Sequence, residues 1–463
     1  MNAPTLRVAG LLLFASLVQC TPPPTARHAL VIVVDTLRAD ALGLYGSPWP
    51  TSPNVDAFGA RSLVFDHAWA QGTYTPSSYV SYMTSTWVRT HGWDFPVLAP
   101  VETGICGWTD LVTLPEVLAR HGFTRTAFVA NPHLTPKLGF PRGFEIWNGL
   151  DVEALGSGDA LPSVGPQPSD SEVVERAREA VFGWEAGRRH FLYVHLMTPH
   201  LPLAPSDGAR QVMDLPEHWS PDGRLDVDRV RALERSSTRE QRDWSRTAYY
   251  ASVWDGDRHI GRILSALAEA GHEDDTVVVL LSDHGESLWE HGEYGHNTGV
   301  WETLARVPLV IRAPGVRPER RSDRPVALID VAPTVISLLG IDEQPDSWQG
   351  ENLLGASRRQ ALFTERLGEV AVTVDGRHKA MGRGRTHDRR WRVFDVRNDP
   401  AEHAALEAPP DREDLPALYA AWSSAHPIAR RDLDAPPVGF CAELTEAERR
   451  ERVRQLRALG YVE

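Results

Sequence analysis

The chain contains very little cysteine. Its 463 residues include three, Cys20, Cys106 and Cys441, and the hydroxyl-rich stretch GTYTPSSYVSYMTS at residues 72–85 has none. Because Cys20 ends an N-terminal leader, only Cys106 and Cys441 remain, and they form either one disulfide or two separate thiols. If the 72–85 stretch holds a reactive group, that group is a hydroxyl.

The chain also lacks an excess of positive charge. Its formal net charge is −14, so a general affinity for nucleic acid is not expected. The chain has 42% hydrophobic and 24% charged residues, and it can therefore bury a large core. One big domain with a smaller one is the natural expectation. The oligomeric state is left open.

The N-terminal apolar run is short. Residues 8–18 cannot span a bilayer as a helix, and residues 1–19 have the form of a secretory signal peptide. The run ends in LVQC and a Pro-rich tether follows at 20–27, which resembles a bacterial lipoprotein signal, so we expect a lipid at Cys20. The alternative is cleavage and release. Both place the protein outside the cytoplasm, as a periplasmic or outer-membrane lipoprotein or a secreted protein, with the lipid as the expected membrane contact.

Continuous apolar runs predict buried strands at residues 29–34, 126–130, 191–196, 276–281 and 307–311. Helical patterns lie between them, at residues 114–122, 171–187 and 257–271. This alternation predicts a doubly wound α/β domain with a mixed, mostly parallel sheet over residues 28–345. Beyond it, segments such as AVTVDG and WRVFDVRND predict a small antiparallel α+β subdomain over residues 346–463, which ends in a charged helix.

Metal-binding residue types follow the predicted strands. Asp35 ends the first strand, and Asp283 and His284 follow the strand at 276–281. In a sheet of this kind, ligands bind beyond the carboxyl ends of the strands. Without a cation these side chains would repel one another or lose solvation, which predicts a divalent metal site. The alternative for each residue alone is a hydrogen-bonded or helix-capping role.

The hydroxyl-rich stretch predicts a helix over residues 76–85, with Thr75 as its N-cap and Pro76 at its first position. There the Thr75 hydroxyl would face free backbone N–H groups and the positive end of the helix dipole, where an anionic ester could bind. A metal-bound Thr75 oxygen could attack phosphorus or sulfur, with Ser77 and Ser78 binding substrate oxygens. On this segment alone, a plain helix cap is the simpler interpretation.

Seven sequence blocks follow one another along the chain: VVDTLRADALGLYG, TPSSYVSYMTS followed by THG, VHLMTPHLPLAP, LLSDHGESLWEHGEYGH, ARVPLVIRAPG, DVAPTVISLLG and LRALGYV. In this order they resemble the sulfatase family of the alkaline phosphatase superfamily. The resemblance implies an alkaline-phosphatase-like fold and a sulfuric ester hydrolase. It implies that Asp35, Asp283 and His284 are metal ligands. It also implies that His200 contacts the substrate or leaving group and that His296 contacts the transferred group.

The chain departs from the family at the nucleophile. Most sulfatases carry Cys-x-Pro-x-Arg, whose Cys becomes formylglycine; no such motif exists here, so that cofactor cannot form. One register puts Tyr74 at the Cys position, but its rigid ring would have to fold back to reach a metal. The other puts Thr75 there, which matches the spacing to SYMTS, so we choose Thr75. Both registers lack the arginine that would stabilise the nucleophile.

Other positions match the family only in part. Thr36 stands where a second acid usually follows the first metal ligand, and the family's Lys-x-His element is represented only by His133 and Lys137, at the wrong spacing. His91, just after the predicted helix, is a further site candidate. The expected substrate contacts are therefore Thr36, Ser77, Ser78, His91 and His133.

A second metal at Asp255 and His259 is a less favoured alternative. The two residues are spaced i, i+4, as in two-metal phosphodiesterases of the superfamily. Their segment VWDGDRHIGRIL, however, resembles a helix that many sulfatases use for packing, with Asp257 as its acid. Glu302 and Arg306, in ETLAR, are expected to be structural.

The predicted function is a metal-dependent sulfuric ester hydrolase that acts on small-molecule, glycan or lipid anionic esters. One divalent cation is expected; the resemblance favours Ca²⁺, and the imidazole ligand gives weight to Mn²⁺ or Zn²⁺. A Thr ester must be hydrolysed by water or passed to another acceptor. The alternatives are therefore a phosphoester or phosphonate hydrolase, a phosphoethanolamine-type transferase, and a catalytically inactive glycan-binding protein.

Overall fold

A computed structural model describes residues 25–93, 108, 110–136, 138–152, 168–296, 299–321, 325–357, 359–383, 389–406 and 414–427. The predictions for the leader, the lipid at Cys20, the Cys106–Cys441 pair and the terminal helix fall outside these residues. Within them, no helix combines the length and apolar character that a membrane span needs.

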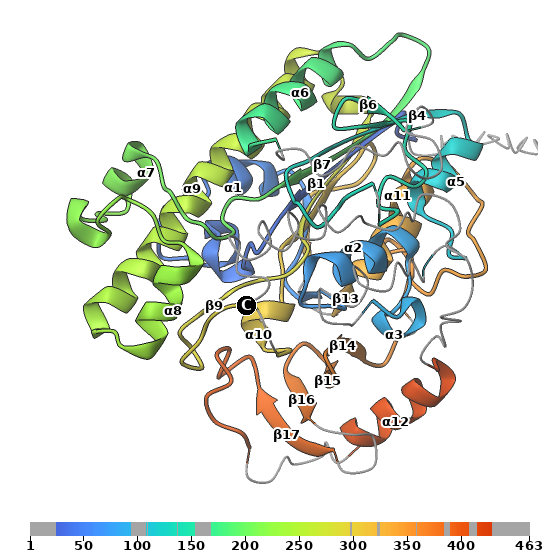
Figure 1. The fold of residues 1–463 in the computed structure, drawn as a ribbon. Helices are drawn as coiled ribbons and strands as arrows, with labels where there is room; N and C mark the ends of the chain where they lie inside the picture. Colours follow the sequence, from blue (N-terminus) through green and yellow to red (C-terminus); the bar gives the residue numbers. More distant parts are fainter. Residues whose placement is uncertain are drawn as a thin grey trace, which may run out of the picture.

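A mixed nine-stranded sheet forms the centre of the fold (Figure 1), in the order β12-β2-β11-β8-β1-β7-β4-β5-β6. Its strands are β1 (His28–Val34), β2 (Leu63–Phe65), β4 (Phe123–Val129), β5 (Ile146–Trp147), β6 (Leu150–Asp151), β7 (Arg189–Leu196), β8 (Thr276–Ser282), β11 (Leu309–Arg312) and β12 (Glu319–Arg321). The four long strands β8, β1, β7 and β4 are parallel, and β11 runs antiparallel to β8. The predicted fold class is confirmed.

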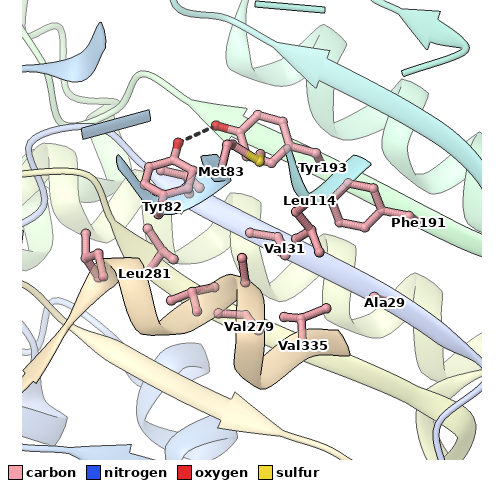
Figure 2. Packing of buried hydrophobic residues seen from close by; sticks show 14 of the residues in the cluster. Ala29, Val31, Tyr82, Met83, Leu114, Phe191, Tyr193, Val279, Leu281 and Val335 are labelled. Carbon is pink, nitrogen blue, oxygen red and sulfur yellow. Dashed lines mark hydrogen bonds between the residues drawn. The ribbon is translucent and has the colours of Figure 1, made fainter. Parts of the chain in front are cut away.

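Helices cover both faces of the sheet. One face packs against α1 (Pro53–Gly59), α6 (Asp170–Phe182) and α9 (Arg239–Glu269), and the other against α2 (Thr75–Thr84), α5 (Leu114–Arg120) and α11 (Val331–Leu338). Alternate residues of β1 therefore enter different cores, with Ile32 on one side and Val31 on the other. This double burial explains why the strand is apolar from residue 29 to residue 34. Figure 2 shows the second core, where the hydroxyl groups of Tyr82 and Tyr193 lie 2.7 Å apart.

Shorter elements complete the main domain. They are β3 (Ala68–Trp69), β9 (Ser287–Leu288), β10 (Tyr294–Gly295), β13 (Val326–Ala327), α3 (Val88–His91), α7 (Asp207–Val212), α8 (Val227–Arg235) and α10 (Glu302–Ala305), with 3-10 turns at Ala39–Ala41, Gly43–Tyr45, Glu217–Trp219, Glu273–Asp275 and Leu328–Asp330.

The predicted small antiparallel subdomain is present. Its strands follow one another in the sheet as β14 (Leu362–Arg366), β15 (Glu369–Val374), β16 (His378–Arg383) and β17 (Arg390–Asp395), and α12 (Leu415–Ala425) packs on them. A buried ion cluster joins this sheet to α10. The Nζ atom of Lys379 lies 2.9 Å from Glu402 Oε1 and 3.3 Å from Glu302 Oε2. Glu302 also accepts a hydrogen bond from Trp69 Nε1, and Arg306 donates to the carbonyl oxygen of Asp66.

The Lys379 cluster makes stability depend on pH. Burial raises the pKa of Glu402 from 4.5 to about 7, since Lys379 offsets only part of the desolvation and Glu302 adds to it. The folded chain thus holds this proton more tightly than the unfolded chain, and the stabilisation is lost as pH rises through 7. We expect Glu402 to lower the free energy of unfolding by about 1.4 kcal/mol between pH 6 and 8. The free energy of unfolding, measured in urea, should change less between pH 6 and pH 8 in Glu402→Gln than in wild type. Equal changes in the two proteins would contradict the assignment.

Candidate active site

Asp35, Asp283 and His284 come together at the carboxyl ends of two neighbouring parallel strands. Val34 of β1 pairs with Ser282 of β8, so the residues that follow them emerge side by side. One ligand atom from each of the three residues lies within 4.8 Å of the others, and all three side chains are fully buried. His284 Nε2 is 3.7 Å from Asp35 Oδ1 and 3.6 Å from Asp283 Oδ2.

The two carboxylates of the cluster have opposite ionisation tendencies. Burial opposes the ionisation of Asp35, but a hydrogen bond with His195 and nearby imidazoles keep its pKa below the ordinary value. Burial and the charge of Asp35 raise the pKa of Asp283 well above its ordinary value. Among the described residues, Asp35 Oδ1 and Asp283 Oδ2 have no hydrogen-bond partner although both are buried. This donor set therefore fits a divalent cation, whose charge would let both acids ionise.

Thr75 points into this cluster from the start of α2. Its Oγ1 lies 3.3 Å from Asp35 Oδ2 and 3.3 Å from His284 Nε2. The prediction that Thr75 is the N-cap is wrong: Tyr74, with an extended backbone at φ −162° and ψ 135°, holds that position. The Thr75 side chain turns to the strand ends and not to the helix backbone. It thus meets the acids and stays at the positive end of the helix dipole.

Tyr74 is directed elsewhere. Its hydroxyl lies 3.3 Å from His133 Nδ1, and its ring packs beneath the guanidinium of Arg366 at 4.4 Å from the ring centroid. Of the two residues that the alignment registers offer, Thr75 lies against Asp35 and His284, and Tyr74 lies against His133.

His296 and His200 extend the cluster. The ring centroid of His296 lies 4.5 Å from that of His284 and 5.1 Å from that of His200. Burial lowers the pKa of His200. Burial also lowers the pKa of His296 to about 4; the charge of Asp35 opposes this shift and the charge of Arg366 adds to it. His296 Nδ1 is 2.8 Å from Glu286 Oε1, which fixes the orientation of the imidazole.

Two further residues, Asn131 and His195, contact Asp35. Asn131 donates hydrogen bonds from Nδ2 to Asp35 Oδ2 and, at 3.3 Å, to Thr75 Oγ1. His195 Nε2 lies 3.3 Å from Asp35 Oδ2, while its Nδ1 is 2.8 Å from the Tyr193 hydroxyl. Asn131 follows β4 closely, so the strand-end argument that identified Asp35 applies to it as well.

The residues expected to contact the substrate lie at different distances from the cluster of Asp35, Asp283 and His284. Ser78 Oγ donates to the backbone oxygen of Asp283 at 2.7 Å, so it fixes α2 on the ligand loop. Ser77 Oγ donates to Tyr74 O at 2.9 Å. His91 Nε2 lies 2.9 Å from Ser81 Oγ, one to two turns along α2 from Thr75. Each of these three side chains thus has a hydrogen-bond partner within the protein.

Thr36 directly follows Asp35 and has a left-handed backbone with φ 56°. Its buried hydroxyl has no hydrogen-bond partner among the described residues. Of the expected contacts, Thr36 and His133 thus lie next to the centre, Thr36 beside Asp35 and His133 against Tyr74. Lys137 lies outside the described residues.

The arrangement around Asp255 and His259 does not resemble a second metal site. Asp255 accepts hydrogen bonds from Ser206 N and Oγ at 2.8 and 2.6 Å. Asp257 accepts three from the first turn of α1, which is the packing role that the resemblance implies. Asp255 and His259 instead line a cavity of about 520 Å³. Its wall also includes His200, Thr198, Ser206, Arg258 and Arg262.

A second group of metal-ligating residue types lies at the opposite end of β1. His28, His272 and Asp275 bring ligand atoms within 4.8 Å of one another. However, His28 Nδ1 accepts a hydrogen bond from His190 N at 3.2 Å, so its proton is on Nε2, the atom that faces Asp275 at 3.6 Å. A protonated nitrogen has no lone pair for a metal, and this group is a packing cluster.

Comparisons with known proteins identify the family of the chain. Residues 27–341 match the family model described as Sulfatase. Bovine arylsulfatase K is 24% identical over 397 residues, and human iduronate 2-sulfatase is 26% identical over 400 residues. Each comparison covers 71% of this chain and 71% of the relative.

Solved structures show the same fold. The phosphonate monoester hydrolase of Agrobacterium radiobacter has a TM-score of 0.65 at 20% identity, covering 86% of this chain and 95% of its own. A protein solved in complex with its substrate D-glucosamine-2-N,6-O-disulfate has a TM-score of 0.67 at 18% identity, covering 87% of this chain and 98% of its own.

Proposed function

Because the chain belongs to the sulfatase family, we propose that it hydrolyses sulfate esters with Thr75 as the nucleophile and a divalent cation at Asp35, Asp283 and His284. One observation carries this proposal. Thr75 Oγ1 lies 3.3 Å from Asp35 and from His284, at the beginning of a helix. A formylglycine cannot form here, and the hydroxyl stands beside the residues that would bind the metal.

The cation would be held by Asp35, Asp283, His284 and Thr75. Two carboxylates and a hydroxyl suit Ca²⁺, our first choice, while the imidazole gives Mn²⁺ or Zn²⁺ as alternatives. When bound, such an ion supplies positive charge to the developing anion and lowers the pKa of the oxygen it touches.

Different side chains of the site carry out the separate steps of ester hydrolysis. The deprotonated Thr75 oxygen attacks the sulfur, forming a Thr–O–S bond as the bond from sulfur to the alcohol oxygen breaks. His200, whose imidazole is neutral because burial lowers its pKa, relays the proton that Thr75 loses to the departing alcohol, and His296, oriented by Glu286, hydrogen-bonds the transferred group. Water then attacks the sulfur, which releases sulfate and restores the hydroxyl of Thr75. Asn131 and His195 hold Asp35 in place throughout.

The alcohol part of the ester would occupy the cavity next to His200. Its volume of about 520 Å³ lies within the usual range for ligand sites. Hydroxyl, imidazole, guanidinium and carboxylate groups line it, from Thr198, Ser206, His259, Arg258, Arg262 and Asp255. Such a lining suits a polar, anionic glycan ester better than an apolar one. Export, and lipid anchorage at Cys20, stay predictions from the leader sequence.

The threonine favours phosphoryl chemistry as the second candidate. A sulfated formylglycine hydrate can eliminate sulfate, whereas an ester on Thr75 must be attacked by water or by another acceptor. A phosphoester or phosphonate hydrolase, or a phosphoethanolamine-type transferase, can use the same groups.

A substrate panel tests these functions. Aryl sulfate, phosphate monoester, phosphodiester and phosphonate should each be assayed with and without EDTA. We expect sulfate ester turnover that EDTA abolishes and Ca²⁺ restores. Phosphodiester turnover with little sulfatase activity would shift the assignment to the second candidate. Failure to turn over any ester at full metal occupancy would contradict the hydrolase and leave a glycan-binding protein.

A further inference from the structure

We propose that Arg366 of the C-terminal subdomain binds the anionic group of the substrate beside Thr75. This inference rests on the proposed function, because it takes Thr75 and the Asp35 cluster as the reaction centre. It assigns a role in the site to the small sheet, which holds the guanidinium at the edge of the centre.

Strand β14 delivers Arg366 to this place. The strand lies along the segment that leads into α2: Glu365 N donates to Gln71 O at 2.9 Å, and Thr364 Oγ1 donates to Ala70 O at 2.8 Å. Arg366 ends the strand with 4% of its surface exposed, and its guanidinium lies 4.4 Å from the centroid of the Tyr74 ring. Tyr74 is bonded directly to Thr75, so the cation lies next to the nucleophile.

The electrostatic effect of Arg366 points to the same centre. The charge of Arg366 acts on His296, whose ring lies 4.5 Å from that of His284. His284 Nε2 is in turn 3.3 Å from Thr75 Oγ1. Arg366 thus lies against Tyr74 and is near enough to His296 for its charge to lower the pKa of that imidazole.

The charge of the centre requires such a cation. The two carboxylates of Asp35 and Asp283 would together neutralise one divalent ion. A sulfate or phosphate ester brings further negative charge to this centre. A guanidinium binds tetrahedral oxyanions through paired N–H groups. Arg366 can supply this contact to the transferred group.

Oxyanion binding by the calcium-loaded full-length protein tests the proposal. Inorganic phosphate and orthovanadate should be titrated calorimetrically into wild type, Arg366→Gln, Arg366→Lys and Arg89→Gln. Arg89 is the matched control, because it is a largely buried arginine that bonds Glu365 in the same interface. We expect Arg366→Gln to weaken binding by about tenfold or more, Arg366→Lys to weaken it less, and Arg89→Gln to bind as wild type.

The control separates a binding role from a structural one. Three outcomes would overturn the proposal: wild type and Arg366→Gln bind the oxyanions equally well, Arg366→Gln and Arg89→Gln lose the same affinity, or wild type binds no oxyanion. Binding that depends on Arg366 in a protein that turns over no ester would uphold it and contradict the hydrolase instead. Where esters are turned over, kcat/KM should fall in Arg366→Gln while the unfolding midpoint stays near that of Arg89→Gln.

Discussion

The Thr75→Ala variant is expected to lose ester hydrolysis by about 10⁴-fold or more. The substitution removes the oxygen that attacks the ester and leaves Asp35, Asp283 and His284 in place. Thr75 Oγ1 is 3.3 Å from two members of this cluster, whereas the Ser77 and Ser78 hydroxyls donate to backbone oxygens, so we expect neither serine to replace it. Steady-state turnover of the best ester of the panel measures the effect.

Two further variants control this result. Thr75→Ser keeps the oxygen and should retain measurable turnover. Thr84→Ala removes a buried hydroxyl of the same helix, one that bonds Val80 O and Thr86, and should leave turnover unchanged. If Thr75→Ala kept more than a tenth of the wild-type rate, Thr75 would not be the nucleophile.

The second large effect is expected from Asp283→Asn, which should abolish stabilisation by calcium while making the metal-free protein more stable. Burial and the charge of Asp35 raise the pKa of Asp283, so the metal-free fold opposes its ionisation. The amide relieves this repulsion, which we expect to add about 1 kcal/mol to the free energy of unfolding in EDTA. Wild type at 100 times its dissociation constant for calcium should gain about 2.7 kcal/mol, and the variant nothing.

Thermal unfolding in EDTA and in excess Ca²⁺ measures both effects, the higher metal-free stability and the lost calcium response. The metal content of each protein is determined alongside. Asp257→Asn is the matched control, since Asp257 is a buried aspartate that caps α1 outside the cluster. It should lose stability in both buffers and keep the calcium response. A calcium response of wild-type size in Asp283→Asn would remove Asp283 from the metal site.

The main fold could be predicted because its signals are local. The continuous β-branched runs are the strands that are buried on both faces, and the strand-end argument identified Asp35, Asp283 and His284. The same argument, applied to the strand that ends near residue 130, would have identified Asn131. Glu286 was also within reach, because it lies in the SDHGES block.

Two features of the site were less accessible. Capping preferences placed Thr75 at the N-cap, one position before the helix, whereas Thr75 is the first residue of α2. Such preferences describe the backbone; the direction of the Thr75 side chain is determined by the acids across the site. Arg366 could not be found from the sequence. It comes from a separate sheet far along the chain, and only the pairing of β14 with the segment before α2 places it beside Tyr74.

Mass spectrometry of the protein quenched during turnover tests the central claim most directly. The tryptic peptide of residues 62–89 contains both Tyr74 and Thr75, and fragmentation distinguishes them. The expected result is a sulfuryl or phosphoryl group on Thr75 that forms with substrate and metal, and disappears in Asp283→Asn. A group on Tyr74, or none on this peptide in an active enzyme, would contradict the account.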